Sequence, residues 1–283
     1  MMGIPEPKAV EGKPLRLGIS SYALPWSVGV PGYPPGSHAV SAEDLIDLAA
    51  RWQVRVVQIA DNMPLGTMDP HRRRQLYERA RGHQIQVEIG VRGLDPDTIQ
   101  SGLALCAEFH SPVLRTIAEV PTLQGAEALA LRLLPALEKA HVILAVENHG
   151  AHTASEIRAW LDAIDHPLVG ACIDTTNSLQ QGESVEDVVS FLAPRAVNVH
   201  LKDFVVSRVA HKLGLTVTGT KPGTGLVNVE RLLVALGSAG YRGSIILEQW
   251  PPLQDSIAET TAMEHAWLSE GIETLRRRFP ALT

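Results

Sequence analysis

Four residues of the kinds that bind divalent cations follow or end successive apolar segments in the second half of the chain. They are Glu147, Asp174, His200 and Glu248. Three carboxylates and one imidazole make an oxygen-rich ligand set, which suits Mn²⁺, Mg²⁺ or Co²⁺ with open positions for substrate oxygens. A structural zinc site would more often recruit cysteine. We therefore predict one bound divalent metal ion, with Mn²⁺ preferred, Mg²⁺ and Co²⁺ as further candidates and Zn²⁺ disfavoured.

The alternative interpretation is that these four residues are independent polar positions at strand ends. For any one of them alone, this interpretation would be about as good as a role in metal binding. Four of them on four successive predicted strands favour a shared ion, because charges buried in a protein are paired or bind metal.

Short apolar segments, each of a length typical of strands, recur along the chain. Several are rich in Val and Ile with little polar alternation, as expected for strands that are buried on both faces. The eight segments are residues 15–22, 54–60, 85–91, 113–118, 142–146, 169–173, 196–201 and 244–247.

Longer amphipathic segments lie between these apolar segments and predict helices. The sequence Ser-Ala-Glu-Asp at 41–44 is a capping-box pattern that starts one helix. Asp95 and Pro96 open another, because proline favours the first helical position. Apolar residues at helical spacing predict further helices over 125–140, 153–164, 184–192, 229–239 and 257–279, and a weaker pattern over 70–81 completes the set.

Strict alternation of strands and helices predicts parallel pairing, since a parallel neighbour needs a crossover connection. Eight such units can close into an α/β fold of the (β/α)₈ TIM-barrel type, whose typical length is about 250 residues. We predict one TIM-barrel domain over residues 1–283, with 1–14 as an N-terminal extension. A doubly wound open sheet is disfavoured, because no G-x-G-x-x-G follows the first strand.

The active site of a TIM barrel is built at the carboxyl ends of its strands. Polar side chains follow every predicted strand except the first, so a ring of them should converge at one end of the barrel. Beyond the four candidate ligands, six residues are candidates for binding substrate or lining the pocket. These are Tyr22, Arg92, His149, Asn177, Lys202 and Trp250.

Two of the charged candidates have an alternative role in ion pairs. Arg92 could hold a carboxylate or phosphate through two hydrogen bonds, or it could pair with Glu119 or Asp61. Lys202 could bind substrate or pair with Asp203.

The other candidates also have alternatives. His149 could donate to substrate or orient a metal ligand. Tyr22 and Trp250 could line the pocket, and packing in the core explains them nearly as well. The segment 25–37, rich in Gly and Pro, is long enough to form a lid after the first strand.

Five stretches of the chain match motifs of one known superfamily. They are Leu-Gly-Ile-Ser at 17–20, Val-Glu-Asn-His at 146–149, Asp-Thr-Thr-Asn at 174–177, Val-His-Leu-Lys-Asp at 199–203 and the segment 223–248. In this ordered combination the chain resembles the sugar isomerase and epimerase superfamily of xylose-isomerase-like barrels. That superfamily includes tagatose 3-epimerase, hydroxypyruvate isomerase, inosose dehydratase and endonuclease IV.

The resemblance implies that the four residues at the strand ends bind the metal. In epimerases of this group, the equivalents of Glu147 and Glu248 also move protons on opposite faces of the substrate, so both are candidate catalytic residues. A metal that chelates a ketone oxygen and a neighbouring hydroxyl stabilises the enediolate formed when the α-proton leaves. The resemblance therefore predicts a metal-dependent isomerase or epimerase of a small keto-sugar or keto-sugar acid.

Two positions depart from the pattern of these epimerases. Many relatives carry His three residues after the Asp of the sixth strand, where this chain has Asn177. Tagatose-type epimerases carry Arg six residues after the His of the seventh strand, where this chain has Val206. The close alternative is a metal-dependent lyase, a decarboxylase or dehydratase of a 3-oxo sugar acid. A DNA repair enzyme similar to endonuclease IV and a non-catalytic sugar-binding barrel are less favoured.

Composition sets the remaining expectations about partners and location. The formal net charge of −6 argues against nucleic acid as a partner, because contact with phosphates needs a basic surface. We find no apolar signal region at the N-terminus and no apolar stretch of about 18 residues, so we expect a cytoplasmic protein with no membrane partner. The expected partner is a small sugar or sugar acid, and the helix over 257–279 could support a homodimer.

Overall fold

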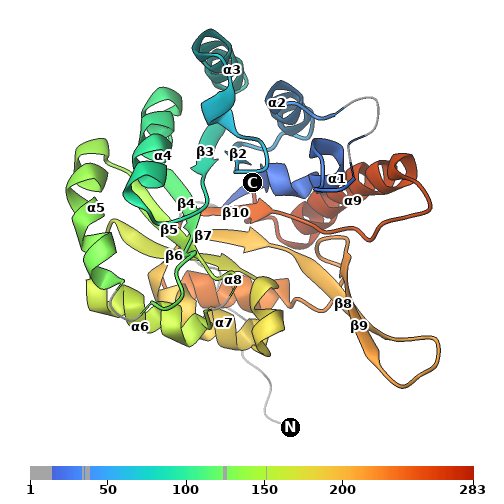
Figure 1. Cartoon of the computed structure of the whole chain (residues 1–283). Coiled ribbons are helices and arrows are strands. Elements are labelled where there is room, and N and C mark those ends of the chain that lie inside the picture. The colour runs from blue at the N-terminus through green and yellow to red at the C-terminus, as the bar shows by residue number, and fades with distance from the viewer. Residues whose placement is uncertain (1–14, 34, 36–38, 124–125, 151) are drawn as a thin grey trace.

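The structure of the chain, a computed structural model, describes residues 15–33, 35, 39–123, 126–150 and 152–283 (Figure 1). The predicted N-terminal extension and part of the predicted lid lie outside the described residues. Within the described part of the chain, parallel strands close into a barrel that is surrounded by helices. The predicted TIM-barrel fold is therefore confirmed.

The eight barrel strands follow the eight predicted segments. Their order around the barrel is β1-β10-β7-β6-β5-β4-β3-β2. All six residues of β6 are buried, because the barrel interior covers one face and helices cover the other. The strands are β1 (Arg16–Ser20), β2 (Val56–Ile59), β3 (Gln86–Gly90), β4 (Val113–Ile117), β5 (Ile143–Glu147), β6 (Val169–Asp174), β7 (Ala196–Leu201) and β10 (Ser244–Leu247).

The first strand is shorter than predicted. Residues Ser21–Ala23 form the 3-10 helix η1, because the Ser20 hydroxyl accepts a hydrogen bond from the backbone of Tyr22 and caps a turn. Tyr22 therefore lies at the barrel mouth and not in a strand.

Most helices in the described part of the chain begin where a side chain can satisfy their first N–H groups, and α1 and α5 are exceptions. Ser41, Thr153 and Ser184 each form a capping box with the acidic residue three positions later. No helix in the described part of the chain combines the length and the apolar character that a membrane span requires. The helices are α1 (Pro25–Val28), α2 (Ala42–Arg51), α3 (Pro70–Gly82), α4 (Pro96–Phe109), α5 (Glu127–Ala140), α6 (Ala154–Ile164), α7 (Val185–Leu192), α8 (Val229–Ser238) and α9 (Ile257–Arg278).

A network of buried polar side chains joins strands inside the barrel. Gln58, Glu88, Asn198 and Ser244 belong to β2, β3, β7 and β10, and none is more than 1 % exposed. Glu88 accepts hydrogen bonds from Gln58 Nε2, Asn198 Nδ2 and Ser244 Oγ. These mutual hydrogen bonds offset the cost of burying the polar groups.

An antiparallel hairpin, which the apolar pattern did not predict, lies between β7 and α8. Its strands are β8 (Asp203–Arg208) and β9 (Leu215–Thr220), and it projects away from the barrel (Figure 1). Val206 pairs with Val217 across it, and both side chains are exposed. Because the outer half of the hairpin is exposed and interspersed with Thr and Ser, its sequence lacks the continuous apolar segment of a barrel strand.

Candidate metal and substrate site

The four candidate ligands lie on strands that are neighbours in the barrel. Glu147 and Asp174 are the last residues of β5 and β6. His200 is the penultimate residue of β7, and Glu248 follows β10 directly. Since β5, β6, β7 and β10 pair in that order, their carboxyl ends carry the four side chains to one arc of the barrel mouth. None of the four is more than 1 % exposed.

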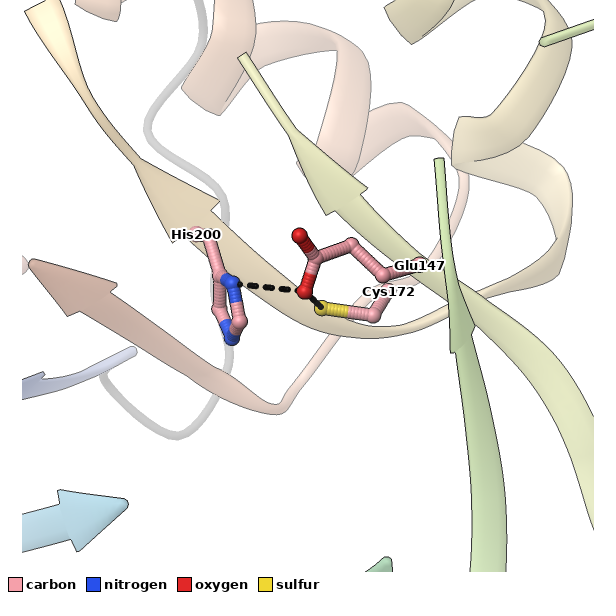
Figure 2. Close-up of side chains that lie close together, drawn as sticks. All are labelled: Glu147, Cys172 and His200. Carbon is pink, nitrogen blue, oxygen red and sulfur yellow. Dashed lines mark hydrogen bonds and ion pairs between the residues drawn. The ribbon is translucent and has the colours of Figure 1, made fainter. Parts of the chain in front are cut away.

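His200 lies at the centre of this group. Its Nδ1 is 3.1 Å from Glu147 Oε2 and 3.4 Å from Glu248 Oε1. Asp174, His200 and Glu248 each offer one ligand atom, and these atoms lie within 4.8 Å of one another. Glu147 forms a second such group with His200 and Cys172 (Figure 2). The structure thus brings the four predicted residues together as two groups that share His200.

Cys172 lies in the floor of the site, where the sequence did not indicate a ligand. Its Sγ is 4.0 Å from Glu147 Oε2 and 3.5 Å from Asn198 Oδ1. Burial raises the pKa of the Cys172 thiol to about 11, so the thiol holds its proton at neutral pH. Because the thiolate is the form that binds metal, the carboxylates and the imidazole are the better ligands.

Three buried atoms in the site have no hydrogen-bond partner among the described residues. They are Asp174 Oδ2, His200 Nδ1 and Glu248 Oε1. Asp174 Oδ2 and His200 Nδ1 each have an ion-pair neighbour, Lys202 Nζ at 2.8 Å and Glu147 Oε2 at 3.1 Å, but neither contact has the alignment of a hydrogen bond. A buried polar atom whose hydrogen-bonding capacity is not filled costs free energy, so three such atoms close together need an explanation. Two carboxylate oxygens and one imidazole nitrogen are suitable ligands for a divalent cation. The residues present therefore fit a metal ion.

Lys202 brings a positive charge into the same group. Its Nζ is 2.8 Å from Asp174 Oδ2 and 3.0 Å from Glu248 Oε2, and it donates to Asn177 Oδ1 at 3.3 Å. Burial would lower the pKa of Lys202, but the neighbouring carboxylates raise it above its usual value, so the ammonium stays charged. The alternative partner, Asp203, instead accepts hydrogen bonds from four backbone N–H groups. Lys202 therefore belongs to the site.

Arg115, in the middle of β4, is a site residue that the sequence analysis missed. It is 2 % exposed, its Nε donates to Glu147 Oε2, and its Nη1 is 3.4 Å from Asp61 Oδ1. Burial would raise the pKa of Glu147, but the charges of Arg115 and His200 hold it well below its usual value. The sequence could have indicated Arg115, because an arginine inside a strand that is buried on both faces must have a charged partner.

Asn177 connects the ligand group to a neighbouring cavity. It begins the 3-10 helix η3 (Asn177–Gln181), and its Nδ2 donates to Glu147 Oε1 at 2.7 Å. Asn177 also lines a cavity of about 570 Å³. His149 and Trp250 line the same cavity, and burial lowers the pKa of His149, which favours the neutral imidazole. Three of the six predicted substrate-side residues therefore share one cavity.

Trp250 forms the wall between this cavity and the hairpin. A Cβ added to Gly219 of β9 would lie 1.5 Å from Trp250 Cδ1, so only glycine lets the indole lie against the strand. The base of the hairpin is thus part of the wall of this cavity.

Tyr22 and Arg92 lie elsewhere on the rim. The Tyr22 hydroxyl donates to Asp61 Oδ2 at 3.0 Å, and burial and the Asp61 charge raise the pKa of Tyr22. Arg92 forms the ion pair with Glu119, 2.6 Å from Nε to Oε1, and about half of each side chain is exposed. Arg92 and Asp61 line a separate cavity of about 430 Å³. The role of Arg92 in substrate binding remains a prediction.

Comparison with known proteins identifies the family of the chain. Residues 97–278 match the family model described as a xylose isomerase-like TIM barrel. The chain belongs to this family. Within it, the chain is 31% identical over 272 residues to a 3-oxo-isoapionate decarboxylase of Pectobacterium atrosepticum, with 94% of this chain and 97% of that protein covered. The predicted superfamily is therefore confirmed.

Solved structures of xylose isomerase-like and epimerase barrels share the fold at low identity. One is a D-psicose 3-epimerase crystallised in the presence of D-fructose, with a TM-score of 0.66 and 14% identity over 93% of this chain and 99% of that chain. Another is a xylose isomerase-like TIM barrel protein from Mycobacterium smegmatis in complex with magnesium, with a TM-score of 0.60 and 15% identity over 93% and 99% of the two chains. At such identities the likeness shows the fold alone.

Proposed function

We propose that this chain is a divalent-metal-dependent decarboxylase of a small 3-oxo sugar acid. The observation that carries the proposal is that donors engage both carboxylate oxygens of Glu147. Its Oε2 accepts from Arg115 Nε, and its Oε1 accepts from Asn177 Nδ2. An epimerase mechanism would require Glu147 to take a proton from carbon. A carboxylate whose two oxygens both accept hydrogen bonds is a weak base. Loss of CO₂ requires no such base, and the similarity to a decarboxylase over nearly the full length supports the same reaction class.

The reaction breaks the bond between the carboxyl carbon and the carbon beside the ketone. The electron pair of that bond moves toward the ketone oxygen, and CO₂ leaves. A divalent cation held by the four ligands would supply Lewis-acid polarisation of the ketone. The carbon that lost CO₂ takes one proton, which we assign to the Lys202 ammonium. Its Nζ is 3.0 Å from Glu248 Oε2, which holds it in the site, and the amine regains its proton from solvent after each turnover.

The cavity of about 570 Å³ is the place that we assign to the substrate carboxylate. Among its described lining residues, which include His149, Asn177 and Trp250, there is no Arg or Lys. Lys202 lies just behind this lining, because its Nζ donates to Asn177 Oδ1 at 3.3 Å. The cavity can therefore hold a carboxylate by hydrogen bonds, with a positive charge close by.

The test is to incubate Mn²⁺-loaded protein with a 3-oxo sugar acid in D₂O and follow CO₂ release and the NMR spectrum of the product. We expect one CO₂ per product and one deuterium on the carbon that lost the carboxylate. A chelator and Glu248→Gln should each abolish the reaction, whereas Glu119→Gln, which alters an exposed carboxylate after β4, should retain it. Inversion of a carbon centre without gas would overturn the proposal.

Epimerisation of a keto-sugar is the second candidate, and one observation favours it. Glu147 Oε2 and Glu248 Oε1 both approach His200 Nδ1, at 3.1 and 3.4 Å, so two carboxylates flank one position. An epimerase would exchange a carbon-bound proton of the matching keto-sugar with solvent, and Glu147→Gln would stop that exchange. A decarboxylase would show no exchange with a substrate that lacks the carboxylate.

A further inference from the structure

The imidazole of His200 is held from its far side by an amide. Its Nδ1 faces Glu147 and Glu248, and its Nε2 lies 2.7 Å from Gln58 Oε1. If the amide oxygen faces the ring, Nε2 must be the donor, and Nδ1 is the nitrogen that remains for a metal ion. The orientation of the Gln58 amide therefore decides which edge of the ring the site presents.

The partners of Gln58 fix that orientation. Its Nε2 donates to Glu88 Oε2 at 3.2 Å and to Asn198 Oδ1 at 3.1 Å. Turning the amide over would place its oxygen against these two oxygens and its NH₂ against the donor nitrogen of His200. Three hydrogen bonds would be lost, so one orientation is strongly preferred.

Glu88 in turn fixes the second amide. Asn198 Nδ2 donates to Glu88 Oε2 at 2.8 Å, which leaves Asn198 Oδ1 as the acceptor for Gln58. Ser244 Oγ donates to Glu88 Oε1 at 2.7 Å, so donors from three different strands surround the carboxylate. Glu88 therefore acts as the acceptor from which the direction of every hydrogen bond in the network follows.

We propose that Glu88 is a positioning residue of the metal site, which acts through Gln58 to hold His200 with Nδ1 directed at the metal position. The His200 Nδ1 atom forms no aligned hydrogen bond among the described residues, and it faces Glu147 and Glu248 at 3.1 and 3.4 Å, as expected for an atom that shares a metal position with them. This inference rests on the metal site of the proposed function, but it does not depend on which reaction that site performs.

The first test is to measure the affinity for Mn²⁺ by calorimetry in two variants. Gln58→Met removes the acceptor for His200 Nε2 at nearly constant volume, and we expect affinity to fall about 10–100-fold, as for other partners of metal-binding histidines. Glu88→Gln keeps the size of the side chain but adds a donor, so the Gln58 amide can turn over. The affinity for Mn²⁺ should therefore fall in this variant as well. Glu88→Gln decides the case if Gln58→Met does not fold.

The matched control is Gln86→Met, which makes the same substitution at the start of β3. Gln86 accepts a hydrogen bond from Arg16 Nη1 and, among the described residues, forms none with the network, so this variant should bind Mn²⁺ within about twofold of the wild type. Circular dichroism and thermal melting of the metal-free variants check that each one folds.

The second test identifies which ring nitrogen binds metal. With nitrogen-labelled histidine and NMR-active cadmium, the wild type should show coupling between the metal and His200 Nδ1. Gln58→Met should weaken this coupling or move part of it to Nε2. The inference is overturned if Gln58→Met and Glu88→Gln bind like Gln86→Met with coupling only at Nδ1. If the wild type itself binds neither metal, the metal site and the proposed function fail together with it.

Discussion

The buried carboxylates at the barrel mouth depend on buried cations for compensation. Arg115 contacts Glu147, and Lys202 contacts Asp174 and Glu248. Burial would lower the pKa of His200, but its anionic neighbours raise it well above its usual value, so three cationic side chains face three carboxylates in the metal-free protein. Each cationic side chain is therefore important for the stability of the metal-free protein, and a metal ion would bind in place of the His200 proton.

Arg115→Met should destabilise the metal-free protein strongly. The substitution leaves Glu147 buried without its main cationic partner, and breaking a buried pair in this way costs about 3–5 kcal/mol. Arg92→Met is the matched control, because its ion pair with Glu119 is about half exposed and should contribute no more than about 1 kcal/mol. Urea unfolding measures both. Equal unfolding free energies for the two variants would show that Arg115 does not compensate Glu147.

The sequence indicated candidate residues at strand ends more readily than residues inside strands. Asp174 and Glu248 lie where a polar residue ends an apolar segment, and that position alone indicates the barrel mouth. Gln58, Glu88 and Arg115 lie within apolar segments, where the pattern does not tell which residues face the barrel interior. Their partners come from other strands, so only closure of the barrel brings them together.

At the scale of elements, a buried carboxylate joins α1 to α9. Glu264 Oε1 accepts from the backbone of Trp26, and its Oε2 accepts from the backbone and the hydroxyl of Ser27. Helix α1 begins the segment that was predicted as a lid, and Glu264 anchors it from the last helix. Burial raises the pKa of Glu264 to about 7, even though these hydrogen bonds lower it.

This raised pKa should make stability depend on pH. The folded protein holds the Glu264 proton more tightly than the unfolded chain, so the contribution is full below about pH 4.5 and is lost as pH rises through about 7. The shift sets an upper limit of roughly 3 kcal/mol. Glu264→Gln does not ionise, so its unfolding free energy relative to the wild type should improve between about pH 5 and pH 8.

Urea unfolding at several pH values tests this expectation. Glu273→Gln, at an exposed position of the same helix, should follow the wild type at every pH. A difference between Glu264→Gln and the wild type that stays constant with pH would mean that Glu264 titrates alike in the folded and unfolded chains.

At this scale too, the sequence predicted the buried elements and missed an exposed one. All eight barrel strands were predicted, because burial on both faces gives each a largely apolar segment. The hairpin of β8 and β9 was not, because its outer half is exposed and it contacts the site only at its base. That contact, Gly219 against Trp250, is visible only once the fold is known.

At the scale of the whole molecule, one ion would connect four of the eight barrel strands. The four ligands come from β5, β6, β7 and β10, and more than a hundred positions of sequence separate the first ligand from the last. The unfolded chain does not hold these residues together, so the metal should bind the folded state selectively. Ligands of this kind raise the unfolding free energy by mass action.

Mn²⁺ at about 100 times its dissociation constant should add about 2.7 kcal/mol to the unfolding free energy, or roughly 5–10 °C to the melting temperature of a domain of this size. Asp174→Asn removes one ligand and should abolish most of that shift, whereas Asp255→Asn, at an exposed position after β10, should keep all of it. Differential scanning calorimetry with and without metal measures the shift. An equal shift in both variants would place the stabilising ion away from the arc of β5, β6, β7 and β10, because an ion bound there must lose affinity when the oxygen of Asp174 loses its charge.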